Sequence, residues 1–301
     1  MTKVCLTISS YRFDDSVAAL LEKAALLVPR VFWRVIVVDS LGTSRIPSLI
    51  RERGWDFIEY HSADTNLGSA GNLARRLELA AATDADFAYA LNHDGELSEE
   101  TVTRLVAAAS RVQGVGAVYP LRVLANKGGR YDFTGTFRLL LPTRSRKEPP
   151  PTALLDTYWG SSNGTLYSLA PVRQGLKPWA DLWMGWEDLG YGWLLAKHGF
   201  RQVIVRDAVF ADFYEFRGLG TARLGAQVSQ KPAWYSYYNA RNLILIGKRI
   251  RPAWDVGASF ACRIALECGT TALFRSQKRE RFSLMARGVW DGLFGRTGQL
   301  R

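Results

Sequence analysis

Asn92, Asp94 and Glu96 are the side chains whose type and spacing most clearly suggest chemistry. They alternate in the segment LNHDGEL, directly after an apolar run at 87–90 that is typical of a buried strand. Carboxylate and amide oxygens are the ligands that Mg²⁺ or Mn²⁺ prefers. The residues SEE at 98–100 predict the start of a helix. The group therefore falls in a strand-to-helix loop, where open α/β sheets bind ligands; the alternative is a solvated turn without a ligand.

A second pair of carboxylates, Glu187 and Asp188, opens a predicted helix at 187–198. A helix N-terminus stabilises an ionised carboxylate, which suits a general base. Trp183 and Trp186 precede the pair and offer flat apolar faces on which sugar rings can pack. The alternative is an acidic first turn beside aromatic residues of the core.

Further polar residues follow the other predicted strands of the first half. A carboxylate such as Asp39 can accept hydrogen bonds from a nucleobase or a ribose, and Arg12 can neutralise a phosphate. The turn NLGSAGN at 66–72 supplies a glycine and a helix N-terminus, whose backbone N–H groups bind anions. Neither GxGxxG nor GxxxxGK[ST] is present. The candidate nucleotide-binding residues are Ser9, Tyr11, Arg12, Asp39, Asn66, Gly68, Asn72 and Asn92.

Predicted strands and helices alternate in the first half of the chain. Strands are expected at 3–9, 34–39, 56–60, 86–91 and 115–119, and helices at 14–27, 45–53, 69–82 and 98–111. This order predicts a mostly parallel, Rossmann-like sheet flanked by helices, with the candidate residues at one edge. A strand at 202–205 and helices at 234–250, 252–275 and 279–294 follow. We expect a catalytic region at 1–220 and a C-terminal helical extension at 221–301.

The composition is that of a folded, enzyme-sized protein. The chain has 301 residues, of which 48% are hydrophobic and 12% aromatic, which argues against disorder. Its three cysteines, Cys5, Cys262 and Cys268, lack metal-ligand spacing and suggest a reducing compartment. We expect no signal peptide and no spanning helix, and hence a cytoplasmic location.

The formal charge of +11 predicts a polyanionic partner. Nucleic acid is not expected, because no module that reads it can be recognised. Basic and aromatic residues alternate over 252–294, a pattern typical of a helix that lies on an anionic membrane surface; the alternative is a helix packed on the rest of the protein with solvated arginines. The proline-rich segment 142–152 is predicted to be a mobile lid over the substrate.

Taken together, the motifs resemble those of glycosyltransferase family 2, whose members are inverting enzymes with the GT-A fold. The resemblance covers most of the chain: TISSYR, VIVVDS and NLGSAGN come in the family's order, LNHDGEL stands at its DXD-type metal motif, and WEDLGYGW at its ED motif. YYNARN at 237–242 is similar to a stretch of rhamnosyltransferase-like bacterial members, and GVWDGLFGRTG to their C-terminal helix.

The resemblance implies a role for individual residues. Asp39 would contact the nucleobase or ribose, and Asn92 and Asp94 would stand at the first and last positions of the metal motif, with Asp94 holding Mg²⁺ or Mn²⁺. Asp188 would be the general base, with Glu187 beside it. The implied activity is transfer of a hexosyl or deoxyhexosyl group from a nucleoside-diphosphate sugar to a glycan or lipid-linked glycan, in polysaccharide biosynthesis.

Three departures from the family pattern leave alternatives open. Gly190 replaces a second Asp of the ED motif, Leu194 stands near an expected Arg, and Asp212 lies where many members have a metal-binding His. A non-catalytic nucleotide-sugar or glycan-binding module is one alternative. A nucleotidyltransferase is another, although its usual glycine-rich loop is missing from SSYRFDD.

Overall fold

The computed structural model describes residues 2–124, 130–131, 133–134, 144–145, 153–212, 218–220, 227–229, 231–250 and 253–300. The chain forms two compact units. We call them the sheet unit, made of the described residues of Met1–Gly135, Arg144–Ala180 and Glu187–Phe213, and the helical unit, made of Asp181–Trp186 and the described residues of Tyr214–Arg301.

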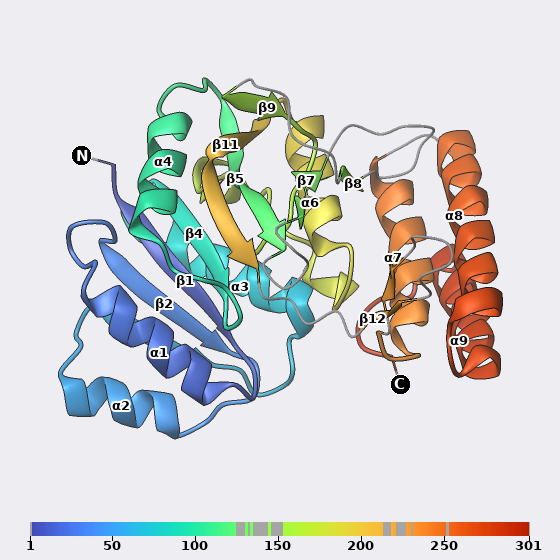
Figure 1. The fold of residues 1–301 in the computed structure, drawn as a ribbon, viewed down its shortest axis with the longest axis horizontal. Coiled ribbons are helices and arrows are strands. Elements are labelled where there is room, and N and C mark those ends of the chain that lie inside the picture. Colours follow the sequence, from blue (N-terminus) through green and yellow to red (C-terminus); the bar gives the residue numbers. More distant parts are fainter. Residues whose placement is uncertain are drawn as a thin grey trace. The chain divides into compact units, whose positions relative to one another are not determined.

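The sheet unit is organised around one large sheet (Figure 1). Its strand order is β3-β2-β1-β4-β10-β5-β11-β9, with β6 paired to β5. The strands are β1 (Val4–Ser10), β2 (Arg34–Asp39), β3 (Ile58–Ser62), β4 (Phe87–Asn92), β5 (Val115–Leu124), β6 (Arg130–Tyr131), β9 (Leu154–Asp156), β10 (Thr165–Ser168) and β11 (Arg201–Asp212). The helices are α1 (Asp14–Ala25), α2 (Arg45–Arg53), α3 (Gly68–Ala81), α4 (Glu99–Ala109), α5 (Ala170–Arg173) and α6 (Glu187–Lys197); β7 (Phe133–Thr134) pairs with β8 (Arg144–Ser145).

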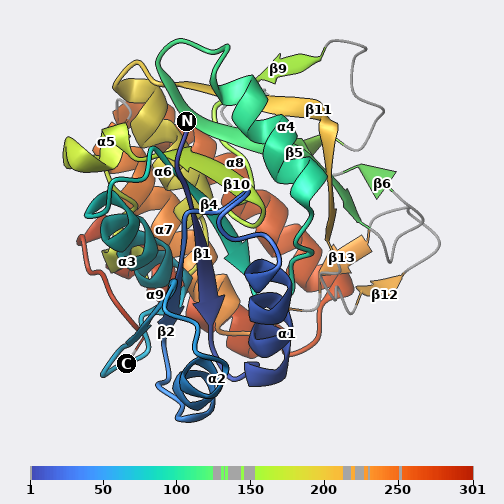
Figure 2. The same cartoon turned by 90° about the vertical axis from the view of Figure 1, so that its left-hand side faces the viewer.

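Helices cover both faces of the sheet. Apolar residues of α1 and α4 pack on one face, and those of α3 and α6 pack on the other, an arrangement that Figure 2 shows for α1 and α3. The strands β1, β2 and β4 are therefore buried on both sides, which explains why their sequences are almost continuously apolar. The predicted α/β fold with a mostly parallel sheet is confirmed.

The parallel register brings the predicted strand ends together. Ser10 lies opposite Asp39, and Ser9 lies opposite Asn92, so β1, β2 and β4 end side by side. We call this carboxyl end of the three strands the strand-end edge. The loop after β4 leads to α4 as expected, since the Ser98 side chain accepts a hydrogen bond from Thr101 N at 3.3 Å and caps the helix.

Some boundaries differ from the sequence prediction. The third strand covers 58–62 rather than 56–60, and the strand expected at 202–205 extends to Asp212. Short strands were expected after residue 152, but without bounds or partners: β10 runs antiparallel between β4 and β5. It contains only four residues, too few for a clear alternation of polar and apolar side chains.

Three long helices form most of the helical unit, α7 (Tyr235–Ile250), α8 (Ala253–Phe274) and α9 (Lys278–Leu293), with the short pair β12 (Gly218–Gly220) and β13 (Gln227–Ser229). The helices α7 and α9 approach very closely at two glycines of α9. A Cβ on Gly288 would lie 2.3 Å from Tyr237 O, and one on Gly292 would lie 3.0 Å from Arg241 O. Larger residues there would force the two helices apart.

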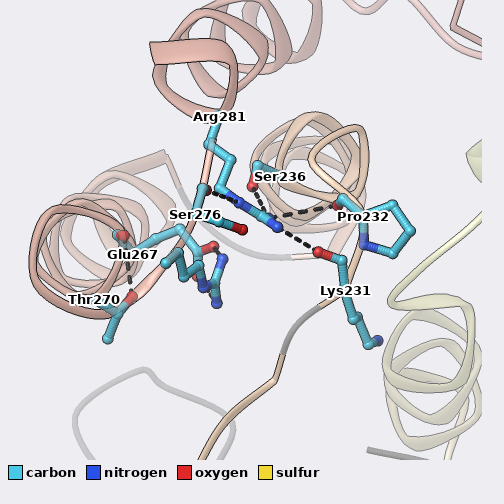
Figure 3. Close-up of polar contacts among 8 residues, drawn as sticks. Lys231, Pro232, Ser236, Glu267, Thr270, Ser276 and Arg281 are labelled. Atoms are coloured by element: carbon cyan, nitrogen blue, oxygen red, sulfur yellow. Dashed lines mark hydrogen bonds and ion pairs between the residues drawn. The ribbon is translucent and has the colours of Figure 1, made fainter. Parts of the chain in front are cut away.

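Arginines of the C-terminal helices take part in the packing (Figure 3). Arg281 is buried and donates hydrogen bonds to Lys231 O at 2.5 Å and Ser276 O at 3.0 Å. Arg275 forms an ion pair with Glu267 of α8. Part of the basic charge predicted for a membrane surface is thus used inside the unit. Among the helices that the structure describes, none has the length and apolar character to cross a membrane.

Candidate functional site

Asp39 ends β2 and organises the loop that follows it. The residue is fully buried, and its carboxylate accepts hydrogen bonds from Leu41 N at 2.9 Å, Thr43 N at 3.3 Å and Tyr60 Oη at 2.8 Å. Burial and the hydrogen bond to Asp39 raise the pKa of Tyr60 to about 12. Because a carboxylate has about four acceptor positions, these three donors leave room for a further contact.

Several buried oxygens around Asp39 have no hydrogen-bond partner among the described residues. The Asn72 amide donates to Val38 O at 2.9 Å and to Ser40 Oγ at 3.0 Å, but its Oδ1 accepts nothing. The other unpartnered oxygens are Ser10 Oγ, Thr43 Oγ1 and Ser69 Oγ. A buried polar atom without a partner costs about 1–3 kcal/mol. This corner of the strand-end edge therefore has hydrogen-bonding capacity that the described side chains leave unused.

The turn that begins α3 is fixed by the residues that the sequence singled out. Asn66 Oδ1 accepts a hydrogen bond from Gly68 N at 2.9 Å, and Gly68 has a left-handed φ of +64°. After β1, Arg12 also has a left-handed φ, of +63°, and its guanidinium lies 5.1 Å from the Tyr11 ring centre. Such a backbone at a non-glycine residue is strained and is often found at ligand sites. Ser9 is half-buried and Arg12 is exposed.

Arg76 lies at the same edge and was missed by the sequence analysis. It is fully buried, and its Nη1 donates to Thr7 O at 3.1 Å and to Leu91 O at 3.0 Å, while Nη2 lies 3.5 Å from Asn92 Oδ1. No carboxylate of the described residues pairs with it, and Nε has no partner there either. Burial lowers the pKa of Arg76 to about 10. The sequence did contain a signal for this residue, since Arg76 directly precedes Leu77 on the buried face of α3.

Two of the predicted metal residues, Asn92 and Asp94, are contacted by a residue just before the neighbouring strand β10. Asn92 and Asp94 are half-buried, whereas Glu96 is exposed. Asn163, just before β10, donates from Nδ2 to Asp94 Oδ1 at 3.2 Å and accepts from Asn92 N at 2.9 Å. Asn163 was not among the residues predicted from the sequence, because its contact with Asp94 depends on the pairing of β10 with β4.

His93 stacks on Phe13, with ring centres 4.1 Å apart and planes 6° apart. Burial lowers the pKa of His93, against an opposing effect of the Asp94 charge.

The donor set at Asp94 suits a particular kind of metal site. The described residues contain no group of three or more His, Cys, Asp or Glu side chains placed to hold a metal ion. Mg²⁺ is usually held by one or two carboxylates together with waters and substrate phosphates. Asp94, with Asn92 beside it, fits a cation whose remaining ligands come from a bound diphosphate. The side chain of Asp212, the alternative oxygen ligand, lies outside the described part of the chain.

Glu187 and Asp188 form the first turn of α6, as predicted. Both are half-buried, and Asp188 Oδ1 accepts a hydrogen bond from Leu189 N at 2.8 Å. Burial, and in smaller part the charge of Asp188, raise the pKa of Tyr119 on β5 and of Tyr167 on β10. The Asp188 carboxylate therefore lies within electrostatic range of two buried tyrosines of the sheet.

Trp183 and Trp186 belong to the helical unit, whereas Glu187 resumes the sheet unit. Trp183 stacks on Tyr238 with ring centres 5.0 Å apart, and the Arg263 guanidinium lies 5.3 Å from the Trp186 ring centre. Both tryptophans have left-handed φ angles, of +60° and +64°. Strained backbone of this kind persists only when its surroundings fix it.

The YYNARN segment on α7 supplies that support. Arg241 and Asn242 are fully buried. Arg241 Nη2 donates to Leu182 O at 2.7 Å, and the Asn242 amide donates to Met184 O at 2.7 Å and to Gly185 O at 2.8 Å. The segment therefore holds the main chain of the loop 181–186. The predicted lid at 142–152 lies outside the described residues, apart from the backbone of β8.

No protein-family model matches the chain, and no curated protein matches its sequence. Its fold is nevertheless similar to that of solved structures. A mannosyltransferase from Pyrobaculum calidifontis in complex with GDP-Man and Mn²⁺ has a TM-score of 0.57 at 14% identity, covering 98% of this chain and 88% of that one. TarS 1–349 from S. aureus in complex with UDP-GlcNAc has a TM-score of 0.61 at 14% identity, covering 98% of this chain and 84% of that one. These likenesses show the fold: the chain has the GT-A architecture of a mostly parallel sheet flanked by helices.

Proposed function

We propose that the protein is an inverting glycosyltransferase that moves a hexosyl or deoxyhexosyl group from a nucleoside-diphosphate sugar to a hydroxyl of a glycan or lipid-linked glycan, in polysaccharide biosynthesis. The observation that carries the proposal is the strand-end edge, where buried oxygens beside Asp39 lack partners among the described residues and where Asp94 lies in the loop that follows β4. The similar structures hold GDP-Man with Mn²⁺ and UDP-GlcNAc, which supports a nucleotide sugar as the ligand.

The donor nucleotide would use the unpartnered oxygens. Ser10 Oγ and Asn72 Oδ1 are acceptors for a base N–H or a ribose hydroxyl, next to the carboxylate of Asp39. The exposed guanidinium of Arg12, the half-buried Ser9 and Tyr11, and the N–H groups at the start of α3 are suited to the phosphates.

Asp94 and Asn92 would hold Mg²⁺ or Mn²⁺ together with the donor diphosphate. The cation would offset the negative charge that grows on the leaving diphosphate. Arg76 would also offset the negative charge on the diphosphate, because its buried positive charge lies beside Asn92 and has no carboxylate partner among the described residues.

Asp188 would take the proton of the acceptor hydroxyl as the general base. The acceptor oxygen forms a bond to the anomeric carbon while the bond from that carbon to the donor phosphate oxygen breaks. The diphosphate leaves with the electron pair, and attack from the opposite face inverts the anomeric centre. Glu187, at the same helix N-terminus, adds negative charge beside the base. We assign Trp183 and Trp186 to the acceptor side, because flat indole rings suit the faces of sugars.

A membrane surface is the partner that we propose for the helical unit, at the cytoplasmic face where a lipid-linked acceptor would lie. Phe282, Trp290 and Leu293 recur along one side of α9, Phe294 follows the helix directly, and all four are exposed, Trp290 by 56%. Lys278 and Arg279 at the start of the helix are exposed too, whereas Arg275 and Arg281 are engaged within the unit. The expected attraction is therefore mostly apolar, with a smaller electrostatic part of about 1 kcal/mol per free basic residue.

Sedimentation with vesicles of a zwitterionic and an anionic phospholipid tests the membrane proposal. Wild type should sediment with anionic vesicles at low salt, and Trp290→Ser should weaken this binding severalfold. Leu26→Ser is the matched control, since Leu26 is an exposed leucine of the sheet unit, next to the end of α1. Equal binding of Trp290→Ser and wild type would contradict the proposal.

Donor screening tests the proposed reaction. Incubation with a panel of nucleotide sugars and glycan or lipid-linked acceptors, with and without Mn²⁺, should give a glycosylated product of inverted anomeric configuration. Asp94→Ala should lose metal-dependent turnover while its circular dichroism stays that of wild type. If Asp94→Ala keeps wild-type activity in Mn²⁺, the metal assignment is wrong. Binding without turnover would identify a non-catalytic module, and pyrophosphate release from a nucleoside triphosphate would identify a nucleotidyltransferase.

A further inference from the structure

Asn163 joins two residues of the candidate metal loop through a single amide. Its Oδ1 accepts a hydrogen bond from Asn92 N at 2.9 Å, and its Nδ2 donates to Asp94 Oδ1 at 3.2 Å. A backbone N–H can only donate, and a carboxylate accepts, so the two contacts fix which end of the amide faces which residue. Asn163 is 6% exposed. It is therefore a buried, oriented donor aimed at Asp94.

The surroundings leave this amide little freedom. The next residue, Gly164, has φ +80° and donates to Ala90 O at 2.8 Å, and a Cβ there would lie 2.6 Å from the Phe210 ring. From the loop side, a Cβ on Gly95 would lie 2.8 Å from Asn163 Oδ1. The glycine at 95 thus allows the loop after β4 to lie against Asn163, and the glycine at 164 allows the turn before β10 to lie against Phe210. Asn163 is held by packing before any ligand binds.

Because of this contact, the two oxygens of Asp94 differ in their hydrogen bonding. Oδ1 accepts the Asn163 amide, whereas Oδ2 accepts no hydrogen bond from a described residue. After accepting the amide, Oδ1 has one lone pair left, whereas Oδ2 has two, so ligation of a cation through Oδ2 alone is favoured over ligation through both oxygens. Single-oxygen ligation suits the octahedral coordination of Mg²⁺, whereas Ca²⁺ accepts more ligands and bidentate carboxylates.

We infer that Asn163 is a positioning residue that makes Asp94 a one-oxygen ligand, and that it thereby favours Mg²⁺ or Mn²⁺ over Ca²⁺ at this site. The inference rests on the proposed role of Asp94 in metal binding. Asn163 acts through Asp94 and needs no contact with the donor. Removing an outer contact of a metal ligand typically costs about 10–100-fold in metal affinity.

Metal binding without turnover tests the inference. Mn²⁺ binding is followed by electron paramagnetic resonance, with Mn²⁺ alone and with GDP or UDP added, and Ca²⁺ is titrated as a competitor. Asn163→Ala should lower Mn²⁺ affinity about 10–100-fold and raise the effectiveness of Ca²⁺ relative to Mn²⁺.

A second variant separates positioning from a merely structural role. Asn163→Asp keeps the side-chain shape and the acceptor for Asn92 N, but it places a carboxylate against Asp94. Its unfolding temperature should fall below that of wild type in EDTA and recover with Mn²⁺, since a cation offsets the repulsion. Thr165→Val is the matched control: it removes a buried hydrogen bond, to Ser161 O at 2.5 Å, in the same turn. That variant should lose the same stability with and without Mn²⁺.

Each outcome decides one point. The inference is overturned if Asn163→Ala keeps the wild-type preference for Mn²⁺ over Ca²⁺, or if Asn163→Asp loses equal stability in EDTA and Mn²⁺. Mn²⁺ binding that is absent from wild type, or that survives Asp94→Ala, overturns it too. If any of these results is found for a protein that transfers sugar, the inference about Asn163 is wrong and the proposed reaction stands. If Mn²⁺ binding depends on Asn163 but no sugar is transferred, the inference stands and the proposed reaction is wrong.

Discussion

Arg76 of the sheet unit and Arg241 of the helical unit are both fully buried, and both donate hydrogen bonds to main-chain carbonyls. Their surroundings differ. Arg241 uses Nε on Asn242 Oδ1, Nη1 on Gly298 O and Nη2 on Leu182 O. Arg76 leaves Nε without a partner among the described residues and reaches Asn92 Oδ1 only at 3.5 Å.

The same difference holds for the neighbours of the two arginines. Around Arg241, the amide of Asn242 donates to three main-chain carbonyls of the loop 181–186, those of Leu182, Met184 and Gly185. Around the strand-end edge, the oxygens of Ser10 and Asn72 have no partner among the described residues. Complete hydrogen bonding is expected where polar groups only stabilise the fold, and incomplete bonding where a ligand supplies the missing partners. This difference supports a stabilising role for the Arg241 cluster and supports the proposed binding of the donor at the strand-end edge.

Asp188 should give the largest effect, because the proposal makes it the base of the reaction. Asp188→Asn keeps the shape but cannot take the proton, so kcat should fall about 10²–10⁴-fold while the affinity for the donor stays near that of wild type. Steady-state kinetics and donor-binding titrations separate the two quantities. A change confined to donor affinity would make Asp188 a binding residue instead.

Arg241→Ala should chiefly lower stability. Gly298 O and Asn242 Oδ1 lose the hydrogen bonds from Arg241, whereas Leu182 O keeps the one from Asn242, and each unsatisfied buried acceptor costs about 1–3 kcal/mol. Urea unfolding should show a loss of at least about 2 kcal/mol, and Arg241→Lys should recover part of it. A variant as stable as wild type would show that the cluster does not hold the loop 181–186.

Ser10→Ala should have the smallest effect. In contrast to Arg241→Ala, it should change donor binding and not lower stability. The Ser10 hydroxyl is buried without a described partner, so its removal should leave the free energy of unfolding unchanged or slightly raised. If the hydroxyl contacts the donor, the KM for donor should rise about 2–10-fold, the equivalent of one hydrogen bond of about 0.5–1.5 kcal/mol. Ser236→Ala, at a buried serine beside Arg281, is the control and should leave KM unchanged. An unchanged KM in Ser10→Ala would remove Ser10 from the donor site.

Local patterns predicted much of the fold. The continuous apolar runs of β1, β2 and β4 and the amphipathic helices between them identified the parallel half of the sheet, and residues at strand ends were therefore expected together. The register of Ser9 with Asn92 and of Ser10 with Asp39 confirms that expectation.

Long-range pairing could not be read in the same way. The contact of Asn163 with Asp94 spans 69 residues and exists because β10 inserts beside β4. No local periodicity encodes the neighbour of a four-residue strand. The role of Arg241 could not be predicted for a similar reason, since its acceptor Leu182 O lies 59 residues earlier in the chain and Gly298 O lies 57 residues later.

Diffraction from crystals soaked with Mn²⁺ and a nucleoside diphosphate tests the central claim most directly. An anomalous difference peak is expected about 2.0–2.2 Å from an oxygen of Asp94, with the diphosphate on the cation and the nucleoside beside Asp39, Ser10 and Asn72. The expected ligating atom is Asp94 Oδ2. A nucleotide bound away from the strand-end edge, or a manganese ion without Asp94 as a ligand, would contradict the account.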